Sequence, residues 1–334
     1  MDKKPVLGIL LGDSAGVGPE IVAKLAANGF LQGHCRPVII GDMRIFERAL
    51  DVVGMQAEHY SIGKVSEADW GRGIPVLDQK NQDPAKIPFG KVDASSGKAV
   101  NDAIALASDL CKSGKIEGFV FAPFNKTSMR EGGLEFESEH HLLAHIFGVS
   151  DRPFGELNVL DGLMCTRASS HIPIKEVSDF LNIDRIVRAI TMSYETLKLS
   201  GLERPRIAVA ALNPHAGEHG KCGREEIDMI EPAIQKARAL GIEAEGPFPS
   251  DILFIKAFNG DFDGVVTMFH DQGQIALKLK GFEQGITVAG GQPYPIATPA
   301  HGTAFDIAGK GIATTTAAEN AVIMAVNMAL NNRK

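Results

Sequence analysis

The chain has 334 residues, 44% hydrophobic and 22% charged, which is typical of a globular protein large enough for two domains. The formal net charge of −7 argues against a nucleic-acid-binding protein, which would need a basic surface to neutralise phosphates. Residues 1–5 lack the features of a signal peptide, the apolar runs are too short to cross a bilayer, and the four cysteines show no close pairing. We therefore expect a cytoplasmic protein that binds neither nucleic acid nor membrane.

Short apolar runs alternate along the chain with segments of helical periodicity. Strands are predicted at residues 5–11, 37–40, 118–122, 206–212 and 264–269, and helices at 19–26, 43–53, 98–112, 175–180, 183–199, 225–240 and 317–330. This alternation predicts βαβ units, and therefore an α/β protein with a mostly parallel sheet and helices on both faces.

Four of the predicted strands end in polar, turn-rich sequence. Ligands of open α/β sheets bind beyond the carboxyl ends of the strands. The four segments are Gly12–Glu20, Pro123–Lys126, Asn213–Glu218 and His270–Gly273. Since all four carry titratable groups, we expect them to contribute to one shared site.

The first of these segments is rich in glycine. Gly12, Gly16 and Gly18 precede a helix that Pro19 opens. Backbone N–H groups in such a turn can bind an anion, although a plain tight turn explains the same residues. The spacing does not match the Gly-x-Gly-x-x-Gly fingerprint, so a Rossmann dinucleotide site is not predicted.

Three histidines, His171, His215 and His270, lie at the ends of apolar runs in turn contexts. A single histidine in such a place is more often structural than a ligand. Three of them at strand ends fit a divalent-metal site, because imidazole is a common ligand of transition metals. The histidines at 140, 141 and 145 share one helical face only in part, and an exposed or interface helix is expected there.

Two lysines and one aspartate near these segments have open roles. Lys126 and Lys278 would hold a carboxylate or phosphate, or move a proton if desolvated, although a solvated surface lysine is the better interpretation of either alone. Asp251 fits an acidic site residue or a helix N-cap.

Taken together and in this order, the motifs resemble a known family. Gly12–Glu20, Ser170-His-Ile-Pro, Leu212–Glu218 and Met268–Gly273 are similar to signatures of 4-hydroxythreonine-4-phosphate dehydrogenases and their 4-phospho-threonate and 4-phospho-erythronate dehydrogenase relatives. The resemblance covers essentially the whole chain. The segment His301–Ala313 is also similar to the nucleotide-binding segment of isopropylmalate and isocitrate dehydrogenases, which places the chain in that wider superfamily.

The resemblance implies two α/β/α domains with a cleft between them, as in isocitrate and isopropylmalate dehydrogenases. A nucleotide-binding domain would comprise residues 1–128 plus 285–334, and a metal, substrate and dimerisation domain residues 129–284. The active form would be a homodimer with shared active sites.

The resemblance also implies the cofactors. His171 and His215 of one subunit and His270 of the other would hold one divalent ion, with Zn, Mg, Mn, Co and Ni all open. NAD would lie along the 301–313 segment, and no arginine cluster there favours NADP. The implied NAD contacts are His301, Gly302, Thr303, Asp306, Gly12 and Asp13.

The implied reaction oxidises the secondary alcohol of a small hydroxy acid to a β-keto acid, with decarboxylation expected. Asp271, Lys126 and Asp251 are the implied catalytic residues, and Lys278 would bind the negative end of the substrate.

The substrate-binding positions depart from the family pattern. Gly133 and Leu134 stand where the family has histidine and threonine, Thr287 replaces an asparagine, and Ile296 replaces an arginine. Loss of a guanidinium removes a bidentate partner for phosphate or carboxylate, although Arg130 or Lys280 would compensate if suitably placed. A phosphorylated sugar acid, an unphosphorylated hydroxy acid and a cis-dihydrodiol carboxylate all remain open as substrates.

Two other classes of function remain as alternatives. A metal-dependent hydrolase or aldolase would use the histidines without a nucleotide, and NAD binding would exclude it. A non-catalytic sugar-acid-binding protein would bind metal and NAD but turn over no substrate.

Overall fold

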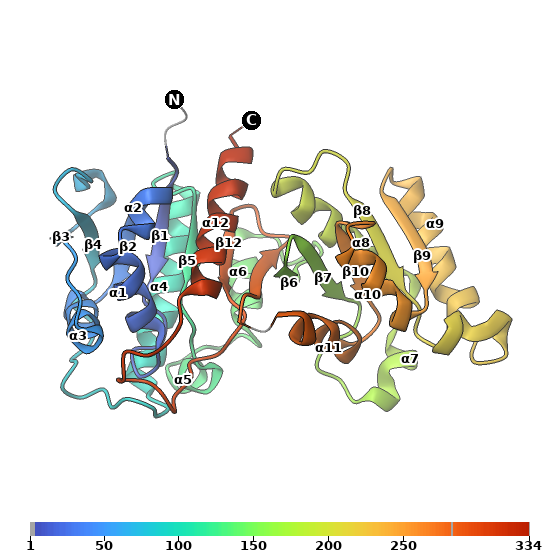
Figure 1. Cartoon of the computed structure of the whole chain (residues 1–334), viewed down its shortest axis with the longest axis horizontal. Coiled ribbons are helices and arrows are strands. Elements are labelled where there is room, and N and C mark those ends of the chain that lie inside the picture. Colours follow the sequence, from blue (N-terminus) through green and yellow to red (C-terminus); the bar gives the residue numbers. More distant parts are fainter. Residues whose placement is uncertain (1–3, 282, 334) are drawn as a thin grey trace. The chain divides into compact units, whose positions relative to one another are not determined.

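The computed structural model describes residues 4–281 and 283–333, which form two compact units (Figure 1). Unit 1 comprises the chain up to Ser150, the short segment Ile286–Val288 and the chain from Gln292 onward. Unit 2 comprises Asp151–Gly285 and Ala289–Gly291. Unit 1 is thus assembled from both ends of the chain, and unit 2 from its middle.

The sheet of unit 1 has the strand order β3-β4-β2-β1-β5-β12-β11. Its neighbours pair in parallel except β11 and β12, which are antiparallel. Strands β1, β5 and β12 are buried along almost their whole length, as expected of parallel strands covered on both faces. The bounds are β1 (Val6–Leu10), β2 (Arg36–Gly41), β3 (His59–Ile62), β4 (Ile74–Asp78), β5 (Gly118–Phe121), β11 (Ile286–Gly290) and β12 (Ile296–Pro299).

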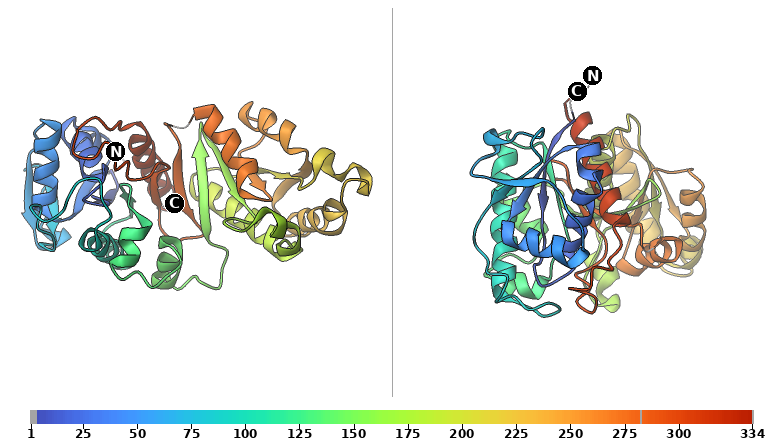
Figure 2. Two further views of the ribbon diagram at one scale, coloured as in Figure 1. Left: turned by 90° about the horizontal axis from the view of Figure 1, so that it is seen from below. Right: turned by 60° about the vertical axis from the view of Figure 1, so that its left-hand side comes forward.

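The helices of unit 1 form two groups, and Figure 2 shows helices on both faces of its sheet. The first group is α1 (Gly18–Ala27), α2 (Phe30–His34), α3 (Met43–Val53) and α12 (Thr316–Asn331), which contact one another in a row. The second is α4 (Ala94–Lys112), α5 (Lys126–Glu131) and α6 (Glu139–Phe147), and a short 3-10 turn, η1 (Val65–Glu67), follows β3.

Helices α5 and α6 belong to unit 1 because they pack on α4. The approach of α5 is so close that a Cβ atom on Gly97 would lie 1.7 Å from the carbonyl oxygen of Ser128. The compact units therefore divide at Ser150 and Asp151, whereas the boundary expected from the sequence lay at residue 128, inside α5.

The sheet of unit 2 has the strand order β6-β7-β10-β8-β9, with β6 and β7 antiparallel and the other neighbours parallel. Its strands are β6 (Gly155–Leu160), β7 (Leu163–Arg167), β8 (Arg206–Ala210), β9 (Glu243–Phe248) and β10 (Gly264–Thr267). Its helices are η2 (Ile174–Glu176), α7 (Val177–Phe180), α8 (Ile183–Leu199), η3 (Pro214–Gly220), η4 (Glu226–Ile230), α9 (Glu231–Ala239), α10 (Ser250–Phe258) and α11 (His270–Gly281). Helices α10 and α11 share a buried apolar cluster with β7, β8 and β10, which fixes them against this sheet.

The predicted α/β class is confirmed, and every predicted strand and helix exists. The predicted helix 183–199 coincides with α8, whereas the predicted helix 225–240 is divided into the π-helical turn η4 and α9. The sequence pattern missed β3, β4, β6, β7, β9, β11 and β12 as well as the helices α2, α5, α10 and α11. No helix in the described part of the chain combines the length and apolarity needed to span a membrane.

Candidate functional site

The glycine-rich turn after β1 is a buried junction. Residues 13–17 each donate their backbone N–H within unit 1, at 2.7 to 3.0 Å. The acceptors are the carbonyl oxygens of Pro123, Asp13 and Thr303, the Ser96 hydroxyl and the Asp13 carboxylate. Because all five donors are engaged, the turn binds other parts of the protein in this structure, which favours the structural interpretation over anion binding.

Gly12 and Asp13 fit this structural role. Gly12 has φ +73°, and a Cβ atom there would lie 2.5 Å from the carbonyl oxygen of Ala122. Asp13 is completely buried and accepts a 2.6 Å hydrogen bond from Ser96. Their contact with a cofactor remains a prediction, and the structure assigns both to the junction between β1 and β5.

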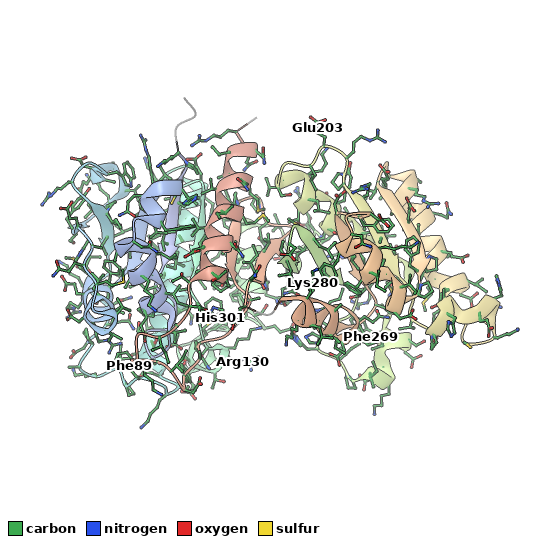
Figure 3. All side chains as sticks on the ribbon, in the orientation of Figure 1. Phe89, Arg130, Glu203, Phe269, Lys280 and His301 are labelled. Atoms are coloured by element: carbon green, nitrogen blue, oxygen red, sulfur yellow. The ribbon has the colours of Figure 1, made fainter. Side chains whose placement is uncertain are left out.

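The segment from His301 to Ala313 is held in place by α1. Both carboxylate oxygens of the buried Glu20 accept backbone N–H groups, from Gly309 at 2.6 Å and Gly311 at 2.8 Å. Lys24, one turn later, donates to the carbonyl oxygen of Ala313. Within the segment, Thr303 is buried, His301 (Figure 3) is half-buried, and Gly302 and Asp306 are exposed. The segment therefore has a fixed shape with a face open to solvent.

Lys126 is the first residue of α5, after the N-cap Asn125. Its side chain is about half exposed (53%), and its Nζ lies 4.0 Å from Oε2 of Glu139, whose own side chain is only 10% exposed. His140 also faces Glu139, at 3.6 Å. The helix expected here exists; in it His140 is buried, His141 is half-buried and His145 is exposed.

The substrate positions that depart from the family lie in two environments. Gly133, with φ +93°, is exposed and Leu134 is half-buried in the loop after α5. Thr287 is buried in β11, where it pairs with Thr298 of β12. Ile296 has no exposed surface and pairs with Phe119 inside the sheet. Position 296 is therefore a core position, which accounts for an apolar side chain.

His171 and His270 of unit 2 lie side by side, with ring centroids 5.9 Å apart. The reason is that the ends of β7 and β10 are hydrogen-bonded beyond the sheet. The N–H of Ser169 and its hydroxyl both donate to the carbonyl oxygen of Met268, at 3.1 and 2.7 Å. The two chain ends therefore leave the sheet together, and each carries its histidine about two residues later.

Asp271 holds the His270 ring through a 2.7 Å contact between Nδ1 and the carboxylate. A carboxylate only accepts, so Nδ1 carries the proton and Nε2 presents its lone pair. This carboxylate–histidine arrangement is typical of a metal-binding imidazole. Lys278, seven residues after Asp271, lies on the same exposed face of α11.

Gln272 connects the strand ends of unit 2, a role that the sequence did not predict. Its Oε1 accepts the N–H of Met268, and its Nε2 donates to the carbonyl oxygen of Ala211 and to the Ser250 hydroxyl. Gln272 thereby ties the ends of β10 and β8 to the start of α10. Asp251 is exposed in the first turn of α10, and the N-cap is Pro249, so the alternative of Asp251 as an N-cap is wrong.

His215 lies in η3, a turn whose backbone is left-handed. His215, Ala216, Glu218 and His219 have φ between 46° and 57°. A non-glycine residue in this conformation costs roughly 1–2 kcal/mol. Such strain is concentrated at functional sites when the surrounding structure enforces it. His215 itself is exposed.

These residues fit a divalent metal in part. Imidazole donors suit a transition metal, and His171 and His270 are adjacent. Among the described residues, however, no three histidine, cysteine, aspartate or glutamate side chains of a single chain are arranged to hold an ion. Within one chain the structure thus brings His171 and His270 together, and His215 is not grouped with them. This differs from the division that the resemblance implies, in which His171 and His215 come from one subunit and His270 from the other.

An α/β protein with titratable side chains at the carboxyl ends of its strands has the arrangement of a ligand-binding or catalytic site. Residues 33–325 match the model of the family described as pyridoxal phosphate biosynthetic protein PdxA. The chain belongs to the PdxA family.

Individual relatives agree with this assignment. A Pseudomonas aeruginosa protein provisionally named 4-hydroxythreonine-4-phosphate dehydrogenase 2 is 43% identical, with 97% of each chain covered. An Oceanobacillus iheyensis protein provisionally named D-threonate 4-phosphate dehydrogenase is 36% identical, with 98% of this chain and 99% of that protein covered. The crystal structure of 4-hydroxythreonine-4-phosphate dehydrogenase from Klebsiella pneumoniae aligns with a TM-score of 0.88 at 34% identity, over 98% of this chain and 99% of the other.

Proposed function

We propose that the protein is a metal- and NAD-dependent dehydrogenase that oxidises the secondary alcohol of a small hydroxy acid to a β-keto acid, which then loses its carboxyl group. The observation that carries this proposal is the His171–His270 pair, with Asp271 fixing the tautomer of His270. Membership of a family whose relatives are named dehydrogenases supports the reaction type.

His171, His215 and His270 would hold the metal, which when bound would lower the pKa of the substrate hydroxyl and stabilise the enolate left by decarboxylation. NAD would accept the hydride and lie along the 301–313 segment, which α1 already holds in shape. Lys126 or Asp271 would take the hydroxyl proton, Asp251 would assist, and Lys278 would bind the negative end of the substrate.

The favoured substrate is a phosphorylated hydroxy acid, 4-hydroxythreonine 4-phosphate or 4-phospho-threonate, since the named relatives carry these substrates in their names. One observation favours a second class. Position 133 offers no side chain and Leu134 is apolar and half-buried, so neither position has a polar side chain that would bind a phosphate. An unphosphorylated hydroxy acid or a cis-dihydrodiol carboxylate is therefore the alternative.

The proposed active form is a homodimer in which each site draws on both chains. One chain does not gather the three histidines, so a second copy would complete the set. Helices α10 and α11 lie side by side, joined by contacts from Gln272 to Ser250 and from Lys280 to Phe258. Both helices expose large apolar residues: Ile252, Ile255, Ile275 and Leu279 are 48 to 84% exposed. An apolar surface next to His270 is suited to an interface with a second chain.

The test is NADH formation, followed at 340 nm with added divalent metal. The substrates are 4-hydroxythreonine 4-phosphate, 4-phospho-threonate, 4-phospho-erythronate, an unphosphorylated hydroxy acid and a cis-dihydrodiol carboxylate. We expect turnover of a phosphorylated acid, its loss in a chelator, and its loss in His270→Ala. Turnover without NAD would instead indicate the hydrolase or aldolase, and binding of NAD and metal without any turnover would indicate a non-catalytic relative.

A further inference from the structure

The left-handed turn that carries His215 depends on a side chain from a different element. The two residues before the turn, Leu212 and Asn213, donate their backbone N–H groups to one carboxylate oxygen of Glu226, at 2.9 and 2.8 Å. The side-chain amide of Asn213 donates to the other oxygen at 3.0 Å. Glu226 is only 2% exposed. Three donors leading into the turn thus converge on one buried acceptor.

The turn itself touches the same carboxylate. Gly217 has φ +75°, and a Cβ atom at this position would lie 2.6 Å from Oε2 of Glu226. A side chain at position 217 would therefore displace either the turn or the Glu226 carboxylate. The side chain comes from η4, a π-helical turn, and such turns are often found at functional sites.

The conformational preferences of its residues do not explain why the turn is left-handed. Four of its five central residues are not glycine and gain nothing from this conformation. Besides the hydrogen bonds within η3 itself, bonds from Cys222 to Gly217 at 3.0 Å and from Lys221 to Glu218 at 3.4 Å close its far end. At its near end, the anchoring groups are Asn213 and Glu226.

We propose that Glu226 is the positioning residue of His215: its buried carboxylate fixes the strained turn, so that the imidazole is held ready for a divalent metal. This inference rests on the proposed function, because the position of His215 matters for the reaction only if the protein binds a metal. Glu226 acts through the backbone of residues 212 and 213 and need not touch metal or substrate.

The neighbouring residue Glu225 provides a matched control. Its carboxylate also accepts from the Asn213 amide, at 2.7 Å, but otherwise from the Ser178 hydroxyl and from the backbone of residues 224 and 225, not from the backbone before the turn. Glu225→Ala therefore removes a carboxylate of the same segment and leaves both backbone contacts of Glu226 in place.

The experiment is a spectrophotometric titration of the metal-free, full-length protein with Co²⁺, followed by the d–d absorption bands. We expect Glu226→Ala to weaken Co²⁺ binding about 10- to 100-fold, as loss of an outer-shell partner typically does. Its spectrum should resemble that of His215→Ala. Glu226→Gln keeps one oxygen that can accept both N–H groups, so it should retain most of the affinity, and Glu225→Ala should bind like wild type.

The outcomes separate the inference from the proposed function. Wild-type binding with unchanged affinity and spectrum in folded Glu226→Ala would overturn the positioning role alone. A spectrum of the wild type that His215→Ala does not alter would also overturn it. Failure of the wild-type protein to bind Co²⁺ would overturn the metal-dependent function and the inference together. If Glu226→Ala does not fold, Glu226→Asp takes its place, since its carboxylate is one methylene group too short to reach both N–H groups. Wild-type affinity and spectrum in Glu226→Asp would overturn the positioning role.

Discussion

Buried carboxylates bonded to backbone N–H groups are a recurring feature of this protein at the scale of single residues. Glu20, Glu226 and Asp42 each accept at least two backbone N–H groups from another part of the chain or from a helix start. A carboxylate can accept several such bonds at once, and a buried charge of this kind is tolerated only when it is so bonded. Each of these residues therefore fixes a loop that has no regular structure of its own.

Asp42 gives a prediction for stability. Burial alone would raise the pKa of Asp42, but hydrogen bonds from Arg44 and from the backbone N–H of Gln82 outweigh this effect and lower the pKa below its ordinary value of 3.8. The residue is also the N-cap of α3. We expect Asp42→Ala to lower the free energy of unfolding at pH 7 by about 2 kcal/mol or more, from the lost cap and the unpaired N–H groups.

The pH dependence follows from the sign of the shift. Because the pKa is lower in the folded state, the carboxylate stabilises the protein fully above the unfolded value and loses this effect as the pH falls through the folded value. In urea unfolding, the difference between wild type and Asp42→Ala should therefore shrink below about pH 4. Asp184→Ala is the control, since Lys236 also lowers the pKa of this aspartate, but its side chain is 78% exposed. An equal loss of stability in both variants would contradict the role of burial.

At the scale of elements, periodicity in the sequence predicted the helices better than the strands. Helix α8 has a regular apolar face and was predicted with its observed bounds. Strand β9, Glu243-Ala-Glu-Gly-Pro-Phe, is polar and contains glycine and proline, so its sequence is typical of a turn and only pairing with β8 makes it a strand. Pairing with a distant strand is not visible in a local pattern.

In the candidate site too, residues in local motifs were predicted, whereas residues that act through distant contacts were not. The motifs placed His171, His270 and Asp271 at strand ends, and in the structure His270 contacts both His171 and Asp271 within one chain. The residues that fix the motifs were not predicted, because Gln272 acts on Ala211 and Ser250 across gaps of 61 and 22 residues. One indication of this role was present in the sequence, because Gln272 lies inside the His-Asp-Gln-Gly motif.

The attachment of the 301–313 segment to α1 gives a prediction for this element. Glu20→Ala leaves the N–H groups of Gly309 and Gly311 without their acceptor, so the segment loses its fixed shape. If NAD binds along this segment, we expect the dissociation constant for NADH to rise about tenfold or more, equivalent to about 1.4 kcal/mol. Fluorescence titration with NADH measures this dissociation constant directly.

A second carboxylate of unit 1 serves as the control for that experiment. Glu117 accepts the N–H of Val6 and pairs with Arg333, away from the 301–313 segment. Glu117→Ala should cost stability without changing NADH affinity. Equal effects of the two variants on NADH binding would mean that Glu20 acts only through global stability.

At the scale of the whole molecule, the apolar surface of α10 and α11 leads to a prediction about the proposed homodimer. Leu279 is 84% exposed, which is unusual for a large apolar residue unless a partner covers it. If this surface is the interface of the proposed homodimer, we expect Leu279→Asp to place a charge there and to shift the protein from twice its chain mass of 35.7 kDa to that mass. Light scattering coupled to size-exclusion chromatography measures the change.

The matched variant for this prediction is Leu240→Asp. Leu240 is also exposed (63%), but it follows α9, away from α10 and α11. The Leu240→Asp substitution should leave the mass of the protein in solution unchanged. A wild-type protein that is already monomeric, or a Leu279→Asp variant that stays dimeric, would exclude this surface as the interface.

The discontinuous course of the chain through unit 1 has a consequence for folding during synthesis. In the sheet order, β12 lies between β5 and β11, yet it is made some 175 residues after β5 (position 296 against 121). While the ribosome synthesises unit 2, β5 remains an unpaired edge on one side, and an unpaired apolar strand is prone to aggregation. Unit 2, by contrast, is almost wholly contiguous and can fold as soon as it emerges. The nascent chain would therefore need a chaperone most while its middle third is being made, and the last 40 or so residues complete the first unit to be started.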